Sequence, residues 1–182
     1  MRKFVSILIA ACFLFVLGCN KKAPTDSNFE AALNQSFQPV CFWIGGIGGQ
    51  IPGNFPGVDP RLDRLVYVGL LSKTPGPPYH AGGEVSPSYN YDYTSTGRQF
   101  EAGPPSHPNF CYATAKVTKI ISFTEPGSDN TSTVSYSWKR TNIAQWANDP
   151  IIQKLYIPNN NFDAEFQSSS QMILTNKGWA VQ

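Results

Sequence analysis

The chain has 182 residues, of which 41% are hydrophobic and 13% aromatic, and its 14 basic residues nearly balance its 12 acidic ones. This length suits a single domain with a substantial core. A chain whose charges are so closely balanced has no basic stripe of the kind that nucleic-acid-binding domains carry. We therefore expect no nucleic-acid partner.

The N-terminus has the pattern of a secretory signal peptide. Arg2 and Lys3 precede an apolar run, Phe4–Leu17, which only Ser6 interrupts. The run is too short to span a membrane, which takes roughly 20 apolar residues, whereas a signal peptide needs about 7–15. We therefore expect the protein to be exported and residues 1–18 to be removed.

The run ends in Val16-Leu17-Gly18-Cys19, which resembles the lipobox of bacterial lipoproteins. It departs from the commonest form because the leucine lies two places before the cysteine, where three is usual. The resemblance implies that Cys19 is acylated and becomes the first residue of a membrane-anchored mature chain. A plain secretory peptide and an N-terminal membrane anchor are the alternatives.

The resemblance also implies a location in the bacterial cell envelope. Asn20 follows the cysteine, where enteric lipoproteins retained at the inner membrane usually carry aspartate, so we expect an outer-membrane anchor facing the periplasm. Residues 19–36 are expected to form the lipidated cysteine and a polar tether, with one helical turn near residues 29–33. Residues 37–182 would then form one globular domain.

The four cysteines have different expected fates. Cys12 leaves with the signal peptide and Cys19 carries the lipid, so Cys41 and Cys111 remain. Cysteines of exported proteins are expected to pair because the periplasm is oxidising. We therefore predict a buried Cys41–Cys111 disulfide, with a reactive thiol as the alternative.

The first part of the domain predicts a strand, a loop and a helix. Residues 41–44 are apolar and predict a buried strand, and the glycine-rich residues 45–57 predict a surface loop, because their spacing fits no phosphate-binding motif. Asp59 and Pro60 are typical of a helix start. Apolar residues at helical spacing then predict the main helix over residues 60–72.

The middle of the chain predicts strands. Tyr89, Tyr91 and Tyr93 alternate with polar residues, which indicates a strand with one aromatic face. A turn at residues 125–130 predicts a hairpin. Alternation predicts that its two inward faces consist of Cys111, Ala113, Ala115, Val117, Ile121 and Phe123 on one strand and of Val134, Tyr136 and Trp138 on the other.

The last part predicts short helical turns near residues 142–156. Asn142 and Gln145 have the spacing of a capping box, and Pro150 starts a second turn. Residues 162–166 and 179–181 predict two further strands, the second after a turn at residues 176–178. The assembled prediction is an α+β fold, with a predominantly antiparallel sheet and one main helix.

No catalytic motif is visible, and we expect no metal and no cofactor. His80 and His107 are the only histidines, whereas a zinc site needs three or four ligands at characteristic spacing. No nucleophile elbow and no carboxylate pair of a glycosidase occurs.

We therefore expect a non-enzymatic binding module, such as an inhibitor, a self-protection factor or an envelope-assembly subunit, whose partner is an envelope protein or cell-wall material. A small periplasmic hydrolase acting on cell-wall material is the alternative. Tyrosine is enriched at interfaces. Tyr79, Tyr89, Tyr91 and Tyr93 are therefore the candidate binding residues, unless their rings simply pack on the sheet.

Overall fold

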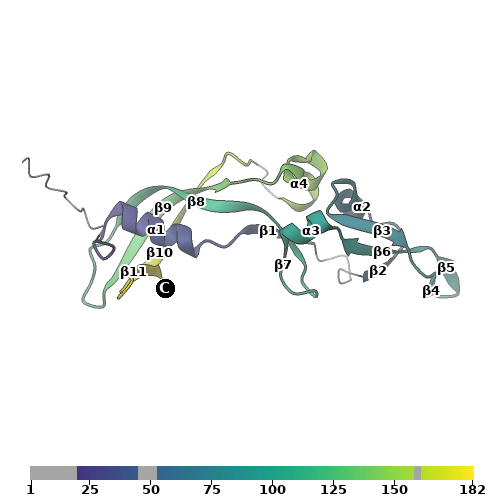
Figure 1. Ribbon diagram of the computed structural model, residues 1–182, viewed down its shortest axis with the longest axis horizontal. Coiled ribbons are helices and arrows are strands. Elements are labelled where there is room, and N and C mark those ends of the chain that lie inside the picture. Colours follow the sequence, from purple (N-terminus) through teal and green to yellow (C-terminus); the bar gives the residue numbers. More distant parts are fainter. Residues whose placement is uncertain (1–19, 45–52, 158–160) are drawn as a thin grey trace, which may run out of the picture.

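The structure is a computed structural model that describes residues 20–44, 53–157 and 161–182. It confirms the α+β fold with an antiparallel sheet. The molecule is elongated, and its elements form two groups along the long axis (Figure 1). Each group has its own hydrophobic cluster, which we call the α1 cluster and the α2 cluster after the helix that each contains.

The main sheet runs through both groups. Its strands are ordered β1-β8-β9-β10-β11, with a short β7 also paired to β8, and all pairs are antiparallel. The predicted hairpin is confirmed, because β8 pairs with β9, and the predicted turn at residues 176–178 joins β10 to β11 in a second hairpin. The strands are β1 (Val40–Trp43), β7 (Glu101–Ala102), β8 (Asn109–Phe123), β9 (Thr131–Thr141), β10 (Glu165–Thr175) and β11 (Gly178–Val181).

The predicted inward face of β8 is wrong in part: Ala113 and Val117 are buried and Phe123 packs against the α1 cluster, but Ile121 does not face inward. The register of β8 against β9 shifts between Val117 and Lys119 and again between Ile120 and Ser122. Each such irregularity turns the following side chains to the other face of the sheet. As a result Ile120 is buried and Ile121 is 46% exposed. The predicted inward face of β9 fits better, because Val134 and Tyr136 are buried and Trp138 packs against the α1 cluster.

Residues 26–36 form a docked helix rather than a polar tether. Helix α1 (Asp26–Ser36) begins at Thr25, whose side chain caps it by accepting a hydrogen bond from the amide of Asn28. Phe29 and Leu33 lie one turn apart and are buried. They join strand residues in the α1 cluster, which consists of Phe29, Leu33, Val117, Ile120, Val134, Tyr136, Met172 and Trp179.

We call the two groups of elements the α1 half and the α2 half, after the cluster that each contains. The α2 half is built around a smaller sheet, which consists of β2 (Gly53–Pro56), β6 (Ser88–Tyr93) and β3 (Leu71–Pro75) in that order. Strand β2 lies within the glycine-rich segment that was expected to be a loop. It forms because Phe55 is buried against Tyr91, with their ring centroids 5.5 Å apart. The rest of that segment, residues 45–52, lies outside the described residues.

The main helix is shorter than predicted. Helix α2 (Pro60–Tyr67) starts at the predicted Asp59 cap, which accepts a hydrogen bond from the amide of Arg61 at 2.8 Å. It ends before residue 72 because Gly69 takes a left-handed conformation with φ of 79°, the usual way for a helix to stop. Leu70 and Leu71 are then buried at the entry to β3.

The remaining elements are short. The predicted capping box at Asn142 is wrong, because Asn142 has φ of 51° and the 3₁₀ turn η1 starts only at Gln145. The turn of helix expected at Pro150 is confirmed as α4. The short elements that complete the fold are the hairpin β4 (Tyr79–Ala81) and β5 (Glu84–Ser86), α3 (Ser95–Phe100), η1 (Gln145–Asn148) and α4 (Pro150–Tyr156).

Candidate functional site

The tyrosine face of β6 belongs to the core and is not an exposed binding surface. The alternation places the three rings on one side, as predicted, but Tyr91 is fully buried and Tyr93 is buried against Phe110. Tyr89 is half-buried at the edge of the same cluster. For these rings the alternative interpretation, packing on the sheet, is correct. Only Tyr79, on β4, is exposed.

A polar network holds α2 on the small sheet. The Tyr91 hydroxyl donates to Oδ1 of Asp63 at 2.6 Å, and Lys73 Nζ donates to both Asp63 oxygens at 2.7 and 2.9 Å. Lys73 also lies 4.1 Å from the centroid of the Tyr89 ring. Burial, together with the hydrogen bond to Asp63, raises the pKa of Tyr91 to about 12, so this phenol stays protonated at neutral pH. The network therefore fastens elements together and offers no proton donor or acceptor near pH 7.

The α2–α4 face, by contrast, presents apolar side chains on firmly held helices. Arg64 of α2 donates to both carboxylate oxygens of Asp149, which also caps α4 through the amides of Ile151 and Ile152. The hydrogen bond from Arg64 lowers the pKa of Asp149, so the pair stays charged. Arg64 also lies 4.0 Å from the centroid of the Tyr67 ring. This face exposes Tyr67, Ile151 and Leu155.

A groove lies in the same half, between the end of α2, α3 and η1. It has a volume of about 490 Å³ and is lined by Val68, Thr96, Gln99, Phe100, Gln145 and Trp146. The rings of Phe100 and Trp146 meet edge to face, with their centroids 5.5 Å apart. The lining offers aromatic surface, amides and a hydroxyl but no ionisable side chain. Such a lining suits recognition better than acid–base chemistry.

The β4–β5 hairpin lies at the end of the long axis opposite α1 (Figure 1). Gly82 and Gly83 both have positive φ, of 58° and 85°, as a two-residue hairpin turn requires. Its strands expose Tyr79 and Val85. The hairpin therefore extends the apolar surface of the α2 half.

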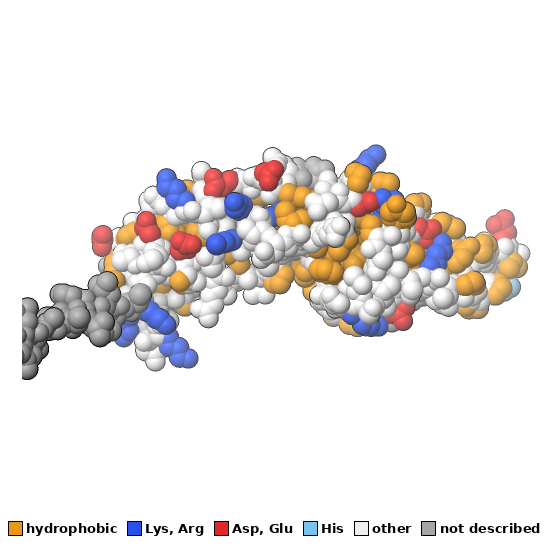
Figure 2. Space-filling view, turned by 45° about the horizontal axis from the view of Figure 1, so that its top comes forward, with side chains coloured by type: hydrophobic (Ala, Val, Ile, Leu, Met, Phe, Trp, Pro, Cys, Tyr) orange, Lys and Arg blue, Asp and Glu red, His pale blue; other side chains and the backbone are white. Residues whose placement is uncertain are grey.

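Exposed apolar side chains are distributed unevenly along the molecule. Among the described residues, eight large hydrophobic side chains are exposed, and Ile121 is the one that belongs to the α1 half. Figure 2 shows hydrophobic side chains gathered toward the α2 end. The other seven are Trp43, Val58, Tyr67, Tyr79, Val85, Ile151 and Leu155.

Sequence reasoning missed most of this surface. It singled out tyrosines that alternate along a strand, and alternation does not say which face becomes covered. A usable signal was present at Tyr67, a large aromatic residue outside the apolar stripe that contains the buried Leu62 and Leu65.

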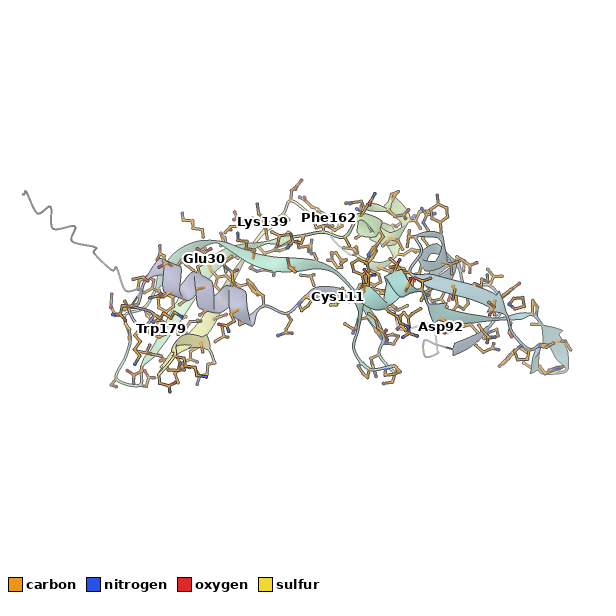
Figure 3. The ribbon with its side chains drawn as sticks, viewed as in Figure 1. Glu30, Asp92, Cys111, Lys139, Phe162 and Trp179 are labelled. Carbon is orange, nitrogen blue, oxygen red and sulfur yellow. A yellow bond between two sulfur atoms is a disulfide. The ribbon has the colours of Figure 1, made fainter. Side chains whose placement is uncertain are left out.

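The predicted disulfide is present. Cys41 of β1 lies opposite Cys111 of β8, with their Cα atoms 3.8 Å apart. The bridge is not buried as expected, because Cys41 is exposed and Cys111 half-buried. Their neighbours Phe42 and Phe110 occupy the buried face instead. Figure 3 shows Cys111 where the two groups of elements meet.

The two histidines lie in different elements. His80 is exposed on β4, and the His107 ring stacks on Trp43 with centroids 6.2 Å apart. Within residues 20–44, 53–157 and 161–182, no three His, Cys, Asp or Glu side chains are grouped so that they could hold a metal ion. No helix in these ranges combines the length and apolar character needed to cross a bilayer. The predicted acylation site, Cys19, lies outside the described residues.

Comparisons of the chain with protein-family models, with curated proteins and with solved structures found no significant match.

Proposed function

We propose that the protein is a membrane-anchored envelope lipoprotein that binds another envelope protein, without catalysis, through the apolar surface of its α2 half. The observation that carries this proposal is the concentration of seven exposed large hydrophobic side chains in that half. Single exposed hydrophobic residues are ordinary, but apolar surface gathered in one region marks interaction sites.

The chemistry of the α2–α4 face supports a protein partner. Tyr67 is 74% exposed and lies beside the Arg64 guanidinium. Tyrosine and arginine, together with tryptophan, are the residues most enriched among those that dominate binding energy at protein interfaces. The Arg64–Asp149 pair joins the two helices of this face. A surface on rigid elements loses little conformational entropy on binding.

The anchor follows from the resemblance of Val16-Leu17-Gly18-Cys19 to a lipobox. Lipid attached at Cys19 would place the chain on a membrane surface and leave the α2 half available to a partner. The acylation is tested by intact mass of the membrane-derived protein and by fractionation of a Cys19→Ala variant. A processed, membrane-associated Cys19→Ala protein would contradict the anchor.

The binding surface is tested with a Tyr67→Ser/Leu155→Ser variant in cross-linking and co-purification from envelopes. Both side chains are exposed, so the melting temperature should stay unchanged while recovery of the cross-linked partner falls at least about tenfold, as for a lost interface anchor. Ile121→Ser is the matched control, because Ile121 is exposed in the other half. A Tyr79→Ser/Val85→Ser variant measures how much the β4–β5 hairpin contributes to recovery of the cross-linked partner.

Equal recovery with all these variants would refute the proposed surface. Release of soluble fragments from cell-wall sacculi by the purified protein would refute the absence of catalysis and favour the hydrolase.

A further inference from the structure

The residues that directly follow Cys19 are fastened to the folded domain. The side-chain amide of Asn28 donates to the carbonyl oxygens of Asn20 and Ala23, at 2.8 and 2.9 Å. The indole Nε1 of Trp179 donates to the same Ala23 carbonyl at 3.2 Å. An anchor at Cys19 would therefore join α1 and β11 directly, without a flexible spacer.

A groove runs between α1 and β11 beside this segment. It consists of two adjoining pockets of about 360 Å³ each, which share Ala32, Gln35, Lys177 and Trp179. Lys21 lines the first pocket as well, and its backbone packs against Gly178 at the β10–β11 turn. The side chains that line the two pockets include two lysines and no carboxylate.

Exposed groups of both signs occur at this end, because Asp26 begins α1 and Asp129 lies in the turn between β8 and β9. Lys21, Lys22 and Lys177 are all exposed, and the ion pairs found in the described residues do not involve them. The α1 residues that line the groove lie at positions 27–28, 31–32 and 35. At 3.6 residues per turn, Glu30 falls on a different side of the helix. Figure 3 shows Glu30 on the side of α1 away from Trp179.

We propose that Lys21, Lys22 and Lys177 contact the anionic phospholipid headgroups of the membrane that holds the lipid of Cys19. This inference rests on the proposed acylation. Only Asn20 lies between Cys19 and Lys21, and the two residue steps from Cys19 to Lys21 span at most about 7 Å, which is within the Debye length of about 8 Å at physiological salt. Lys21 therefore keeps part of its attraction to the headgroups, as basic juxtamembrane segments do, and Lys177 lies close to it because both line the first pocket.

The contact fixes the orientation of the molecule. The α1 end forms the base on the bilayer, and the β4–β5 hairpin lies at the opposite end of the long axis, away from the membrane (Figure 1). The α2–α4 face is then held off the membrane, accessible to a partner.

Lysine acetylation, read by mass spectrometry, tests the contact on the acylated protein in two settings. One is detergent, and the other is vesicles of equal parts phosphatidylcholine and phosphatidylglycerol. We expect Lys21, Lys22 and Lys177 to react severalfold more slowly in the vesicles. The exposed Lys116, Lys119 and Lys154 should react equally in both and serve as internal controls. Vesicles of phosphatidylcholine alone should give little protection.

A charge variant gives a second measurement. Lys21, Lys22 and Lys177 are the basal lysines, because they lie at the end of the molecule that faces the bilayer in this proposal. Replacing all three with glutamine should speed transfer of the acylated protein between anionic vesicles by about fivefold per lysine. The Lys116→Gln/Lys119→Gln/Lys154→Gln variant changes the net charge equally and should transfer like the wild type.

The outcomes separate this inference from the anchor itself. Anchored, acylated protein whose basal lysines react as fast in vesicles as in detergent would overturn the headgroup contact and leave the lipoprotein proposal standing. Protein that carries no lipid on Cys19 and does not associate with vesicles would overturn both.

Discussion

Replacing Phe29 with alanine measures whether α1 is part of the folded core. The Phe29 side chain is fully buried, and its ring centroid lies 4.8 Å from that of Trp179 and 4.9 Å from that of Phe123. Removing a buried phenylalanine leaves a cavity and costs about 3–5 kcal/mol. For a domain of this size each kcal/mol lowers the melting temperature by about 2–4 °C, so Phe29→Ala should lower it by about 10 °C.

The assay is thermal unfolding followed by circular dichroism, with urea unfolding as a second measure. Gln35→Ala is the control, because Gln35 is exposed on the same helix and alanine keeps the helix propensity. If residues 26–36 were an undocked tether, Phe29→Ala would match this control. Melting temperatures within about 1 °C of each other would refute the docking of α1 and the rigid base inferred from it.

Three further predictions concern stability. A Cβ added to Gly97 would lie 1.9 Å from the Leu70 carbonyl oxygen, so Gly97→Ala should destabilise by at least about 1–3 kcal/mol in urea unfolding. Gly127→Ala, which meets only the movable Asp129 side chain, should not. Although burial opposes it, hydrogen bonds from Lys73 and Tyr91 lower the pKa of Asp63. The resulting stabilisation is present above the unfolded-state pKa and lost as the pH falls through the folded-state value. Asp63→Asn should therefore lose less stability than the wild type between neutral pH and about pH 3, and an unchanged loss would contradict this. Reducing the Cys41–Cys111 disulfide, which joins residues 70 apart, should lower the free energy of unfolding by about 4 kcal/mol in urea titrations, and equal midpoints with and without reductant would contradict it.

Features set by neighbouring residues could be predicted from the sequence. The Asp59-Pro60 start of α2, the helix at Pro150 and the β10–β11 hairpin each depend on a few adjacent residues whose backbone preferences agree. The disulfide was predictable as well, because the export expected from the N-terminal pattern would leave Cys41 and Cys111 free to pair.

Features set by distant parts of the chain were not predictable. Two register shifts turn the side chains that lie between them, so Ile120 rather than Ile121 packs in the α1 cluster together with Val117 and Phe123. Strict alternation contains no sign of such shifts. Likewise, residues 19–36 contain few apolar residues and therefore looked like a polar tether. The partners that bury Phe29 and Leu33 lie on strands far along the chain, so the segment itself gives no sign of its docking.

The candidate surface shows the same limit. Periodicity identified which tyrosines share a face of β6, but the packing of α2 decides that Tyr91 is covered. The position of Tyr67 outside the apolar stripe of α2 was the better guide to an exposed ring.

The place of the Cys41–Cys111 bridge has a mechanical consequence. The chain between the two cysteines contains β2, α2, β3 to β6, α3 and β7. The disulfide therefore closes most of the α2 half into a covalent loop that is joined to the main sheet at the bridge. If the proposed lipid held the N-terminal end and the proposed partner pulled on Tyr67, the tension would divide between two backbone routes, residues 42–66 and residues 68–110. Peeling the four-residue β1 from β8 would then require breaking a covalent bond as well as a few hydrogen bonds.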